Sequence, residues 1–215
     1  MKTKAFLSFL LAAGTALSLA ACGDDDDPSP EEPAVAHAGI NVSSDGSYTL
    51  YRKTDYGDDW IYVNLSSLDT VAVSEETHRD DLSWDIAFNR YNIRTNSGTS
   101  GIGNGGAIRT ESTKLADVTA VPAGVDFTAD TDWEITKMPT MDANGFIPMA
   151  SSANPLLSTA ITIIVKNGPP DYNISDDVFL IRTADGSKVF KFKTVSFFNE
   201  RGQSGFYNFM LEELK

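Results

Sequence analysis

The chain has 215 residues, of which 17 are basic and 30 acidic, and its formal net charge is −13. This acidic excess argues against a nucleic-acid-binding protein, because too few Lys and Arg side chains are available to neutralise phosphates. The single Cys excludes a disulfide framework or a cysteine-rich metal module, and the two His offer little for acid–base catalysis or zinc coordination. We therefore expect a binding protein rather than an enzyme, with no nucleic acid among its partners.

The first 21 residues have the pattern of a cleaved targeting signal. Lys2 and Lys4 flank the start of an apolar run of 17 residues at positions 5–21, which is shorter than the ~20 residues that usually span a bilayer. The run ends in the sequence LAAC at positions 19–22, which resembles the lipobox of bacterial lipoproteins. This resemblance implies cleavage before Cys22, which then carries the acyl chains. We predict a lipoprotein signal peptide at residues 1–21, lipidation at Cys22, and membrane contact through that anchor alone.

Residues 22–39 are predicted to form an acidic, proline-rich tether between the lipid anchor and the folded part. Four consecutive aspartates at positions 24–27 repel one another, and prolines at positions 28, 30 and 33 block helix and sheet. The aspartate run lacks a turn-forming Gly at the spacing of a calcium-binding loop. An acidic run directly after the lipid-bearing Cys resembles the surface-export signal of Bacteroidetes lipoproteins. This resemblance implies an outer-membrane protein that faces the cell exterior.

From residue 40 to residue 215 the sequence shows neither a second linker nor an internal repeat. Short runs of β-branched and aromatic residues between turn signals predict a mostly β, single antiparallel domain with at most one or two short helices. Only Ser74–Leu82 has a weakly helical pattern. The Asp185-Gly186 pair predicts a tight hairpin and the glycines at 202 and 205 a looser reversal, so the last three strands should form an antiparallel meander. The predicted strands are 48–51, 60–63, 83–88, 133–136, 160–165, 178–182, 188–193 and 206–210.

Two further patterns resemble catalytic or cofactor motifs. The sequence GIGNGG at positions 101–106 matches the G-x-G-x-x-G string of dinucleotide sites, but the residues after it favour a strand over the helix that such a site requires. We interpret it as a flexible loop. A hydrolytic triad would need His78 as its base, since His37 lies in or beside the tether, and no G-x-S-x-G elbow occurs. His78 lies in the charged run 75–81, which predicts a solvated face without catalytic function.

Three of the five methionines, Met138, Met141 and Met149, lie within twelve residues of one another. Two prolines and a glycine in this segment predict a loop. Methionine sulfur is a soft ligand that proteins use for haem iron. Methionine more often fills irregular space in a core. On side-chain chemistry alone the core role is favoured, and both interpretations stay open.

Two stretches of the folded part identify a family resemblance. The first is WDIAFNRYNIRTN at positions 84–96 with the glycine loop after it, and the second is VFLIRTADG at positions 178–186 with the lysine-rich strand after it. Together they resemble the HmuY family, haem-binding lipoproteins of Bacteroidetes. The resemblance implies a nearly all-β fold, a non-catalytic function and haem b as the ligand. It also implies that haem is taken from host haemoproteins and passed to a TonB-dependent outer-membrane receptor.

The ligand pattern of that family is altered in this chain. Family members hold the iron between two axial side chains, a His pair in the founding member and Met in some relatives. The second family position falls near residues 166–169, where Asn167 stands instead of His, and the first falls in the region 138–146. The resemblance leaves three possibilities: ligation by two of Met138, Met141 and Met149, ligation by one Met, or a member that has lost haem. We expect Met141 and a second methionine such as Met149 to bind the iron.

A binding function of another class is the alternative. Trp60, Trp84 and Trp133 could form a stacking platform for sugar rings on a surface lipoprotein that binds a glycan or a protein partner. The alternating run around Trp84 predicts that this side chain packs in the core instead.

Overall fold

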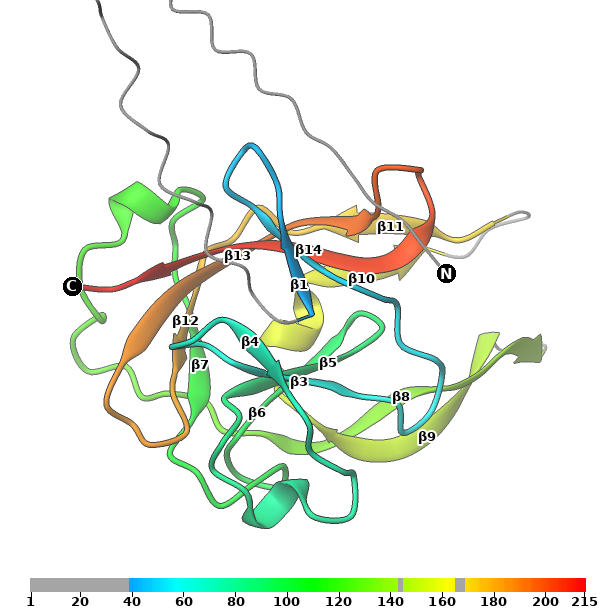
Figure 1. The fold of residues 1–215 in the computed structure, drawn as a ribbon, viewed down its shortest axis with the longest axis horizontal. Helices are drawn as coiled ribbons and strands as arrows, with labels where there is room; N and C mark the ends of the chain where they lie inside the picture. The colour runs from blue at the N-terminus through cyan, green and yellow to red at the C-terminus, as the bar shows by residue number, and fades with distance from the viewer. Residues whose placement is uncertain (1–38, 143–144, 165–168) are drawn as a thin grey trace, which may run out of the picture. The chain divides into compact units, whose positions relative to one another are not determined.

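Fourteen β-strands form most of the regular structure in the computed structural model, which describes residues 39–142, 145–164 and 169–215 (Figure 1). They make a six-stranded sheet, a four-stranded sheet and two separate hairpins, and each pair of strands is antiparallel. This arrangement confirms the predicted antiparallel β fold. The predicted signal peptide, Cys22, the tether up to residue 38 and Asn167 lie outside the described residues.

The six-stranded sheet has the strand order β1-β2-β14-β13-β12-β7. The predicted meander is present, because β12 pairs with β13 and β13 pairs with β14. Gly186, in the turn between β12 and β13, has a φ of +75°, which glycine adopts without steric cost. The strands of this sheet are β1 (Ile40–Val42), β2 (Tyr48–Leu50), β7 (Gly106–Arg109), β12 (Phe179–Arg182), β13 (Val189–Phe198) and β14 (Ser204–Glu213).

An aromatic core joins this sheet to the four-stranded sheet, which has the order β4-β3-β5-β6. The ring of Phe88 on β5 lies 5.5 Å from that of Phe209 and 4.9 Å from that of Tyr207, and Phe192 lies 5.3 Å from Phe209. All four rings are fully buried. Burial of each phenylalanine contributes about 1.5–3 kcal/mol. The strands of the second sheet are β3 (Ile61–Asn64), β4 (Asp69–Val71), β5 (Ile86–Asn89) and β6 (Asn92–Thr95).

The other face of the four-stranded sheet is also buried. Side chains alternate along a strand, so Val63 faces the aromatic core while its neighbour Tyr62 faces away from it. A long hairpin of β8 (Thr131–Asp142) and β9 (Gly145–Ala153) covers this second face. The four-stranded sheet is therefore the middle one of three layers. The buried residues of the second cluster are Trp60, Tyr62, Trp84, Ala87, Ile135 and Ala153.

The methionine-rich segment 138–149 lies in this hairpin and not in the predicted loop. Residues 138–142 belong to β8 and residues 145–149 to β9. The prediction is wrong because Pro139 and Pro148 do not break strands here. Each of the two strands pairs only with the other within its sheet, so each has a free edge. A proline is tolerated on such an edge, where its missing N–H removes no hydrogen bond.

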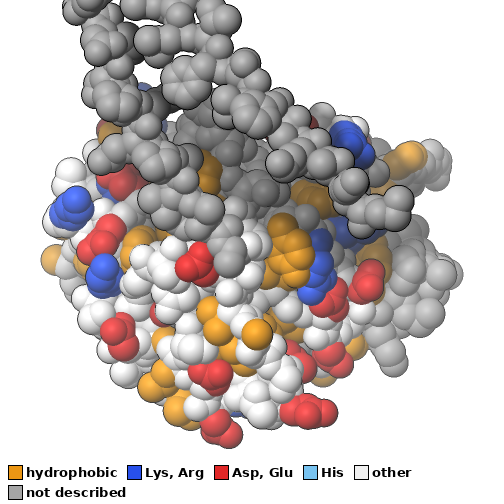
Figure 2. Space-filling view, viewed as in Figure 1, with side chains coloured by type: hydrophobic (Ala, Val, Ile, Leu, Met, Phe, Trp, Pro, Cys, Tyr) orange, Lys and Arg blue, Asp and Glu red, His pale blue; other side chains and the backbone are white. Residues whose placement is uncertain are grey.

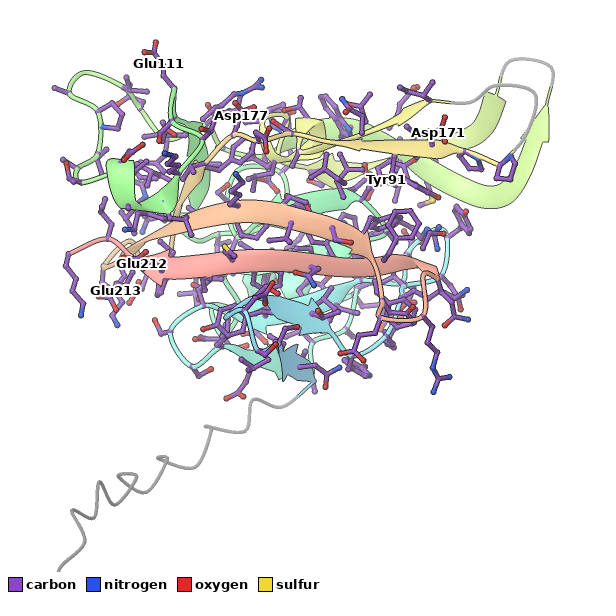
Figure 3. The ribbon with its side chains drawn as sticks, turned by 90° about the horizontal axis from the view of Figure 1, so that it is seen from above. Tyr91, Glu111, Asp171, Asp177, Glu212 and Glu213 are labelled. Carbon is purple, nitrogen blue, oxygen red and sulfur yellow. The ribbon has the colours of Figure 1, made fainter. Side chains whose placement is uncertain are left out.

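A second hairpin, β10 (Ile161–Ile164) with β11 (Asp171–Ile174), projects from the same end of the fold as β8–β9 (Figures 1 and 3). The ring of Tyr172 on β11 lies 4.8 Å from that of Phe197 on β13, which fixes this hairpin to the six-stranded sheet. Tyr91, in the turn between β5 and β6, lies near the same end (Figure 3). The two hairpins and this turn therefore share one end of the fold.

Helical structure in the described ranges is limited to three 3-10 turns, His78–Asp80, Leu115–Asp117 and Leu157–Thr159. The first of these turns lies within Ser74–Leu82, where a weak helix is predicted from the sequence. The other two were not predicted. None of the helices found between residues 39 and 215, within the described ranges, has the length and apolar character needed to cross a membrane.

The glycine-rich loop at 101–106 packs around Asn96. The Asn96 amide donates to the backbone oxygens of Asp81 at 2.7 Å and Trp84 at 3.0 Å, and its Oδ1 accepts from the Gly103 N–H at 3.1 Å. A Cβ atom at Gly101 would lie 2.1 Å from Asn96 Oδ1, and one at Gly103 would lie 2.6 Å from the Asn96 backbone oxygen. The loop then enters β7 rather than a helix, as predicted. Its glycines serve close packing and not a dinucleotide.

The surface carries the acidic excess of the sequence. On the face shown in Figure 2, Asp and Glu side chains of the described residues are dispersed among apolar and neutral ones.

Candidate functional site

The β8–β9 hairpin carries the three methionines predicted as candidate iron ligands. Met149 on β9 pairs with Ile135, and Met141 on β8 pairs with Phe146. Ile135 and Met141 are six residues apart on β8, whereas their partners Met149 and Phe146 are three residues apart on β9. β8 therefore contains three extra residues between the two pairs. Met138 lies in this irregular segment. Bulges redirect side chains out of the regular alternation of a strand, and they are frequent next to functional sites.

Met149 is the one of the three methionines whose side chain lies in the described part of the structure. Met149 is half-buried and packs against the second apolar cluster together with Trp133. Its thioether therefore fills core space, as the commoner role of methionine predicts. The side chains of Met138 and Met141 lie outside the described part of the structure, as does Asn167. The fold brings the three methionines onto one hairpin and gives a packing role to Met149.

A cavity of about 530 Å³ lies at the base of the hairpin and is lined by Asp132, Trp133, Glu134 and Ala150. Its size is in the range of about 300–1,000 Å³ that is typical of small-molecule sites. The half-buried ring of Trp133 offers a flat apolar surface. Within the described ranges, no group of three or more His, Cys, Asp or Glu side chains could hold a metal ion. Methionine sulfur is a soft metal ligand, and the three methionines of this segment lie on the hairpin.

A buried cation fixes β9 to the four-stranded sheet. Arg94 on β6 is 1% exposed, and its guanidinium lies 3.6 Å from the ring centroid of Trp60. It donates to the backbone oxygen of Ser152 and to Oγ of Ser151, each at 3.2 Å. It also donates to both carboxylate oxygens of Glu75 at 3.0–3.2 Å. The guanidinium is paired and hydrogen-bonded, as a buried charge must be.

His78 belongs to this buried network and does not lie on the predicted solvated face. It is 3% exposed, and Arg94, which can only donate, bonds to its Nε2 at 3.2 Å. The proton is therefore on Nδ1, which donates to the backbone oxygen of Glu75 at 2.7 Å. Burial, followed by the charge of Arg94, lowers the pKa of His78 and keeps the imidazole neutral. Both ring nitrogens are engaged, so His78 offers neither an iron ligand nor a general base.

A buried carboxylate fixes the start of β8. Asp130 is 2% exposed and accepts hydrogen bonds at 2.5–3.0 Å from the N–H and Oγ1 of Thr95, Oγ of Ser100 and Nδ2 of Asn154. Burial outweighs these bonds and raises the pKa of Asp130 to about 6. Both strands of the hairpin are therefore anchored at its base, β8 by Asp130 and β9 by Arg94.

Sequence patterns did not single out either anchor. Arg94 lies inside the stretch that carries the family resemblance but outside the strands predicted from the sequence, among polar residues that give no sign of its burial. Asp130 lies in a polar segment without periodicity, and its partners are 24 to 35 residues away along the chain. No local pattern indicates it.

The three tryptophans do not form a common stacking platform. Trp84 is 0% exposed and Trp60 is 6% exposed, because the hairpin covers the face of the sheet on which they lie. The core position predicted for Trp84 is confirmed. The platform that included Trp60 and Trp84 is wrong, and Trp133 is the member that borders a cavity.

Both the sequence and the fold match known proteins. A family model described as HmuY protein matches residues 56–210. The crystal structure of an apo HmuY analog (TFO) from Tannerella forsythia is 24% identical with a TM-score of 0.57, and the match covers 79% of this chain and 95% of that one. A candidate lipoprotein from Bacteroides fragilis NCTC 9343 is 27% identical with a TM-score of 0.58, covering 79% and 92%.

A third solved structure, a candidate HmuY-like heme binding protein from Bacteroides vulgatus ATCC 8482, is 24% identical with a TM-score of 0.57. That match covers 80% of this chain and 96% of the other. None of the curated proteins matches the sequence.

The fold and the site define an antiparallel β protein of the ligand-binding type, in which a long hairpin is anchored to a buried sheet. The family model covers most of the chain, including the four-stranded sheet and both hairpins, whereas β1 and β2 of the six-stranded sheet precede it. The protein belongs to the HmuY family, and the predicted family is confirmed. This family is of the haem-binding type.

Proposed function

We propose that this protein is a surface-anchored, non-catalytic lipoprotein that captures haem at the end of the fold where the two hairpins project. Family membership supports the proposal, as does a relative from Bacteroides vulgatus that is named heme binding. The observation that carries it is the β8–β9 hairpin, whose strands contain the three methionines, border a cavity and are both anchored at the hairpin base.

Thioether sulfur supplies the iron ligands in this proposal. We take Met141 and a second methionine as the axial pair. Met138 lies in the bulged segment, whereas Met149 must leave its contacts with the second cluster before it can bind iron. The residues present fit haem in two respects: thioethers are ligands that haem iron accepts, and Trp133 presents an apolar face in a cavity of suitable size. Bound haem, of the b type, supplies the iron that these sulfurs hold.

The remaining parts of the proposal concern location and transfer. Cys22 carries the lipid after removal of residues 1–21, and residues 22–39 tether the domain to the outer membrane on the cell exterior. The similar protein from Bacteroides fragilis, which is named as a candidate lipoprotein, supports this. Haem is taken from host haemoproteins and passed to a TonB-dependent receptor. Metabolic labelling with a fatty acid tests the anchor, since Cys22→Ser should abolish the label and the membrane attachment.

Titration of the purified protein with haemin, under oxidising and reducing conditions, tests the site. We expect a shifted Soret band in the wild type and a weakened or altered band in Met141→Ala. Met210→Ala is the matched control, because Met210 is a half-buried methionine on β14, outside both hairpins. The site is refuted if no band shift occurs in either redox state. It is also refuted if alanine at 138, 141 and 149 leaves the spectrum unchanged.

A further inference from the structure

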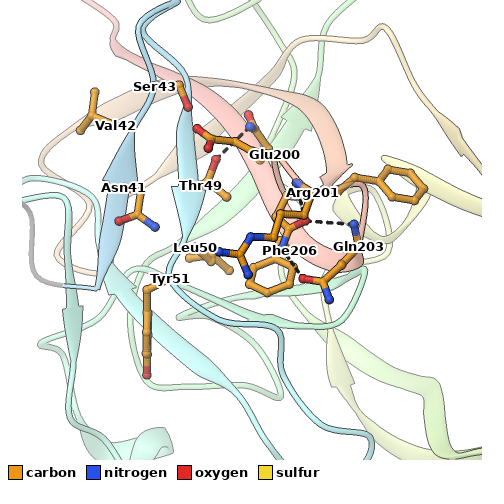
Figure 4. Close-up of a pocket in the computed structure, with 13 residues that line it drawn as sticks. Asn41, Val42, Ser43, Thr49, Leu50, Tyr51, Glu200, Arg201, Gln203 and Phe206 are labelled. Carbon is orange, nitrogen blue, oxygen red and sulfur yellow. Dashed lines mark hydrogen bonds between the residues drawn. The ribbon is translucent and has the colours of Figure 1, made fainter.

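A second cavity, of about 590 Å³, lies on the six-stranded sheet, away from the β8–β9 hairpin (Figure 4). It opens where β2 and β14 separate, since these strands pair at only two positions. Phe206 and Asn208 on β14 line it, and they alternate with Tyr207 and Phe209, which face the aromatic core. The cavity is therefore on the outer face of the sheet.

A row of polar side chains crosses three strands at this cavity. Asn41 on β1 pairs with Thr49 on β2, which pairs with Asn208 on β14, so neighbours in the row are about 4.8 Å apart along the sheet. The amide nitrogen of Asn208 donates to Oγ1 of Thr49 at 2.9 Å. Its Oδ1 is buried and has no hydrogen-bond partner. If the oxygen and nitrogen of this amide changed places, the nitrogen would be the atom without a partner.

An unpaired end of a buried amide is unusual in proteins and costs free energy until a partner is supplied. The other groups at the cavity do not supply one. Because Oδ1 of Asn208 is enclosed, the amide must turn toward the cavity before a ligand hydroxyl, which can both donate and accept, can pair with it.

One wall of the cavity is a preformed turn between β13 and β14. The Asn199 N–H donates to the Gln203 backbone oxygen at 3.0 Å, and the Asn199 amide donates to Oε1 of Gln203 at 2.8 Å. Oδ1 of Asn199 accepts from the backbone N–H groups of Arg201 and Gln203 at 3.0 and 2.9 Å. Polar side chains at the rim are thus held before a ligand arrives, which lowers the entropic cost of binding.

Aromatic rings stand beside these polar groups. Phe206 lines the cavity, and Tyr51 and Phe198 at its sides are 49% and 40% exposed. Large exposed rings next to amides suit a ligand that has both an apolar face and hydroxyl groups. The charged lining residues are one acid and one base, Glu200 and Arg201, which disfavours a phosphate or a metal ion. A lipid would leave the amides without partners.

We propose that this cavity binds a neutral sugar, with the C–H face of the ring on the aromatic side chains and its hydroxyls on Asn41, Asn208 and Gln203. This site is separate from the haem site and does not depend on it. A surface protein with both sites would attach to a glycan while it holds haem.

The test is a titration of the isotope-labelled, purified protein by nuclear magnetic resonance with glucose, galactose, mannose and N-acetylglucosamine, each alone. We expect saturable shifts at the cavity residues with at least one of them. Asn208→Ala and Phe206→Ala should each weaken binding by about tenfold, the effect of one lost hydrogen bond or ring contact. Asn173→Ala, at an exposed asparagine on β11, is the control and should bind normally.

Each alternative result is decisive. Absence of saturable shifts with all four sugars, or shifts that map outside the cavity, overturns the proposal. So does normal sugar binding by Asn208→Ala. Circular dichroism establishes that the variants are folded, and Asn41→Ala replaces any that is not. Haemin titrations of the same variants should match the wild type, which separates this site from the haem site.

Discussion

Replacement of Arg94 by Met tests whether the buried network holds the long hairpin in place. Methionine keeps an unbranched apolar stem and removes the guanidinium, so the Ser152 backbone oxygen and Nε2 of His78 lose their donor. Each unpaired buried acceptor costs about 1–3 kcal/mol. Glu75, whose side chain is 32% exposed, keeps the hydrogen bond from Tyr62 and gains water. We expect the free energy of unfolding to fall by about 4 kcal/mol, within the range for a broken buried ion pair.

Urea denaturation followed by circular dichroism measures this loss. Arg52→Met is the matched control, because Arg52 pairs with Asp59 at 2.7 Å near the surface, where their side chains are 38% and 29% exposed. Loss of such a pair should cost less than about 1 kcal/mol. Amide hydrogen exchange should also become faster along β9 in Arg94→Met and not in Arg52→Met. Equal losses of stability in the two variants, or unchanged exchange along β9, would refute the reasoning.

Four further outcomes are expected. Asp130→Asn should lower the free energy of unfolding by about 2–3 kcal/mol in urea denaturation, because the new amide presents a donor to the Thr95 N–H, whereas Asp132→Asn on the exposed side of β8 should be neutral. Gly103→Ala should lower the melting temperature, since its Cβ would lie 2.6 Å from a backbone oxygen. His78 should lower stability between pH 7 and pH 5, because the unfolded chain binds a proton that folded His78 resists, whereas Asp130, whose pKa is raised to about 6, acts in the opposite direction. His78→Gln should remove that part of the slope, and an identical slope would contradict this cause. Haem affinity, measured by spectroscopic titration, should be nearly equal at pH 7.5 and pH 5.5, because a thioether does not take up a proton. Each imidazole ligand would instead lower the affinity about tenfold at pH 5.5.

Much of the fold could be predicted because its strands are rich in β-branched and aromatic residues. β14 around Phe209 buries alternate side chains, whereas the runs around Tyr62 and Phe88 are buried on both faces. The turn at Gly186 follows from the left-handed conformation that its position requires. Local rules suffice where the local pattern and the tertiary contacts agree.

The predicted strand 133–136 lies in β8, but the rest of the β8–β9 hairpin could not be predicted because its two strands have only one neighbour each. Pro139 and Pro148 are strong local signals against a central strand, and they carry no information about a free edge. The three extra residues of β8 also disturb the period of two that identifies a strand.

The buried network was missed for a different reason. Glu75 and His78 lie in a run of charged residues that normally marks a solvated surface. Their inward orientation depends on Arg94, which lies 16 residues beyond His78 and 19 beyond Glu75. A contact over that separation is decided by strand pairing and not by neighbours in the sequence.

The unequal burial of the three tryptophans gives the protein its own optical reporter. Trp60 and Trp84 are buried in the interior, so their fluorescence emission should be blue-shifted and insensitive to added quenchers. Trp133 borders the cavity at the hairpin base, where a bound ligand that absorbs in the near ultraviolet would quench its fluorescence by energy transfer. Loss of its emission would then follow occupancy in real time, without an attached dye.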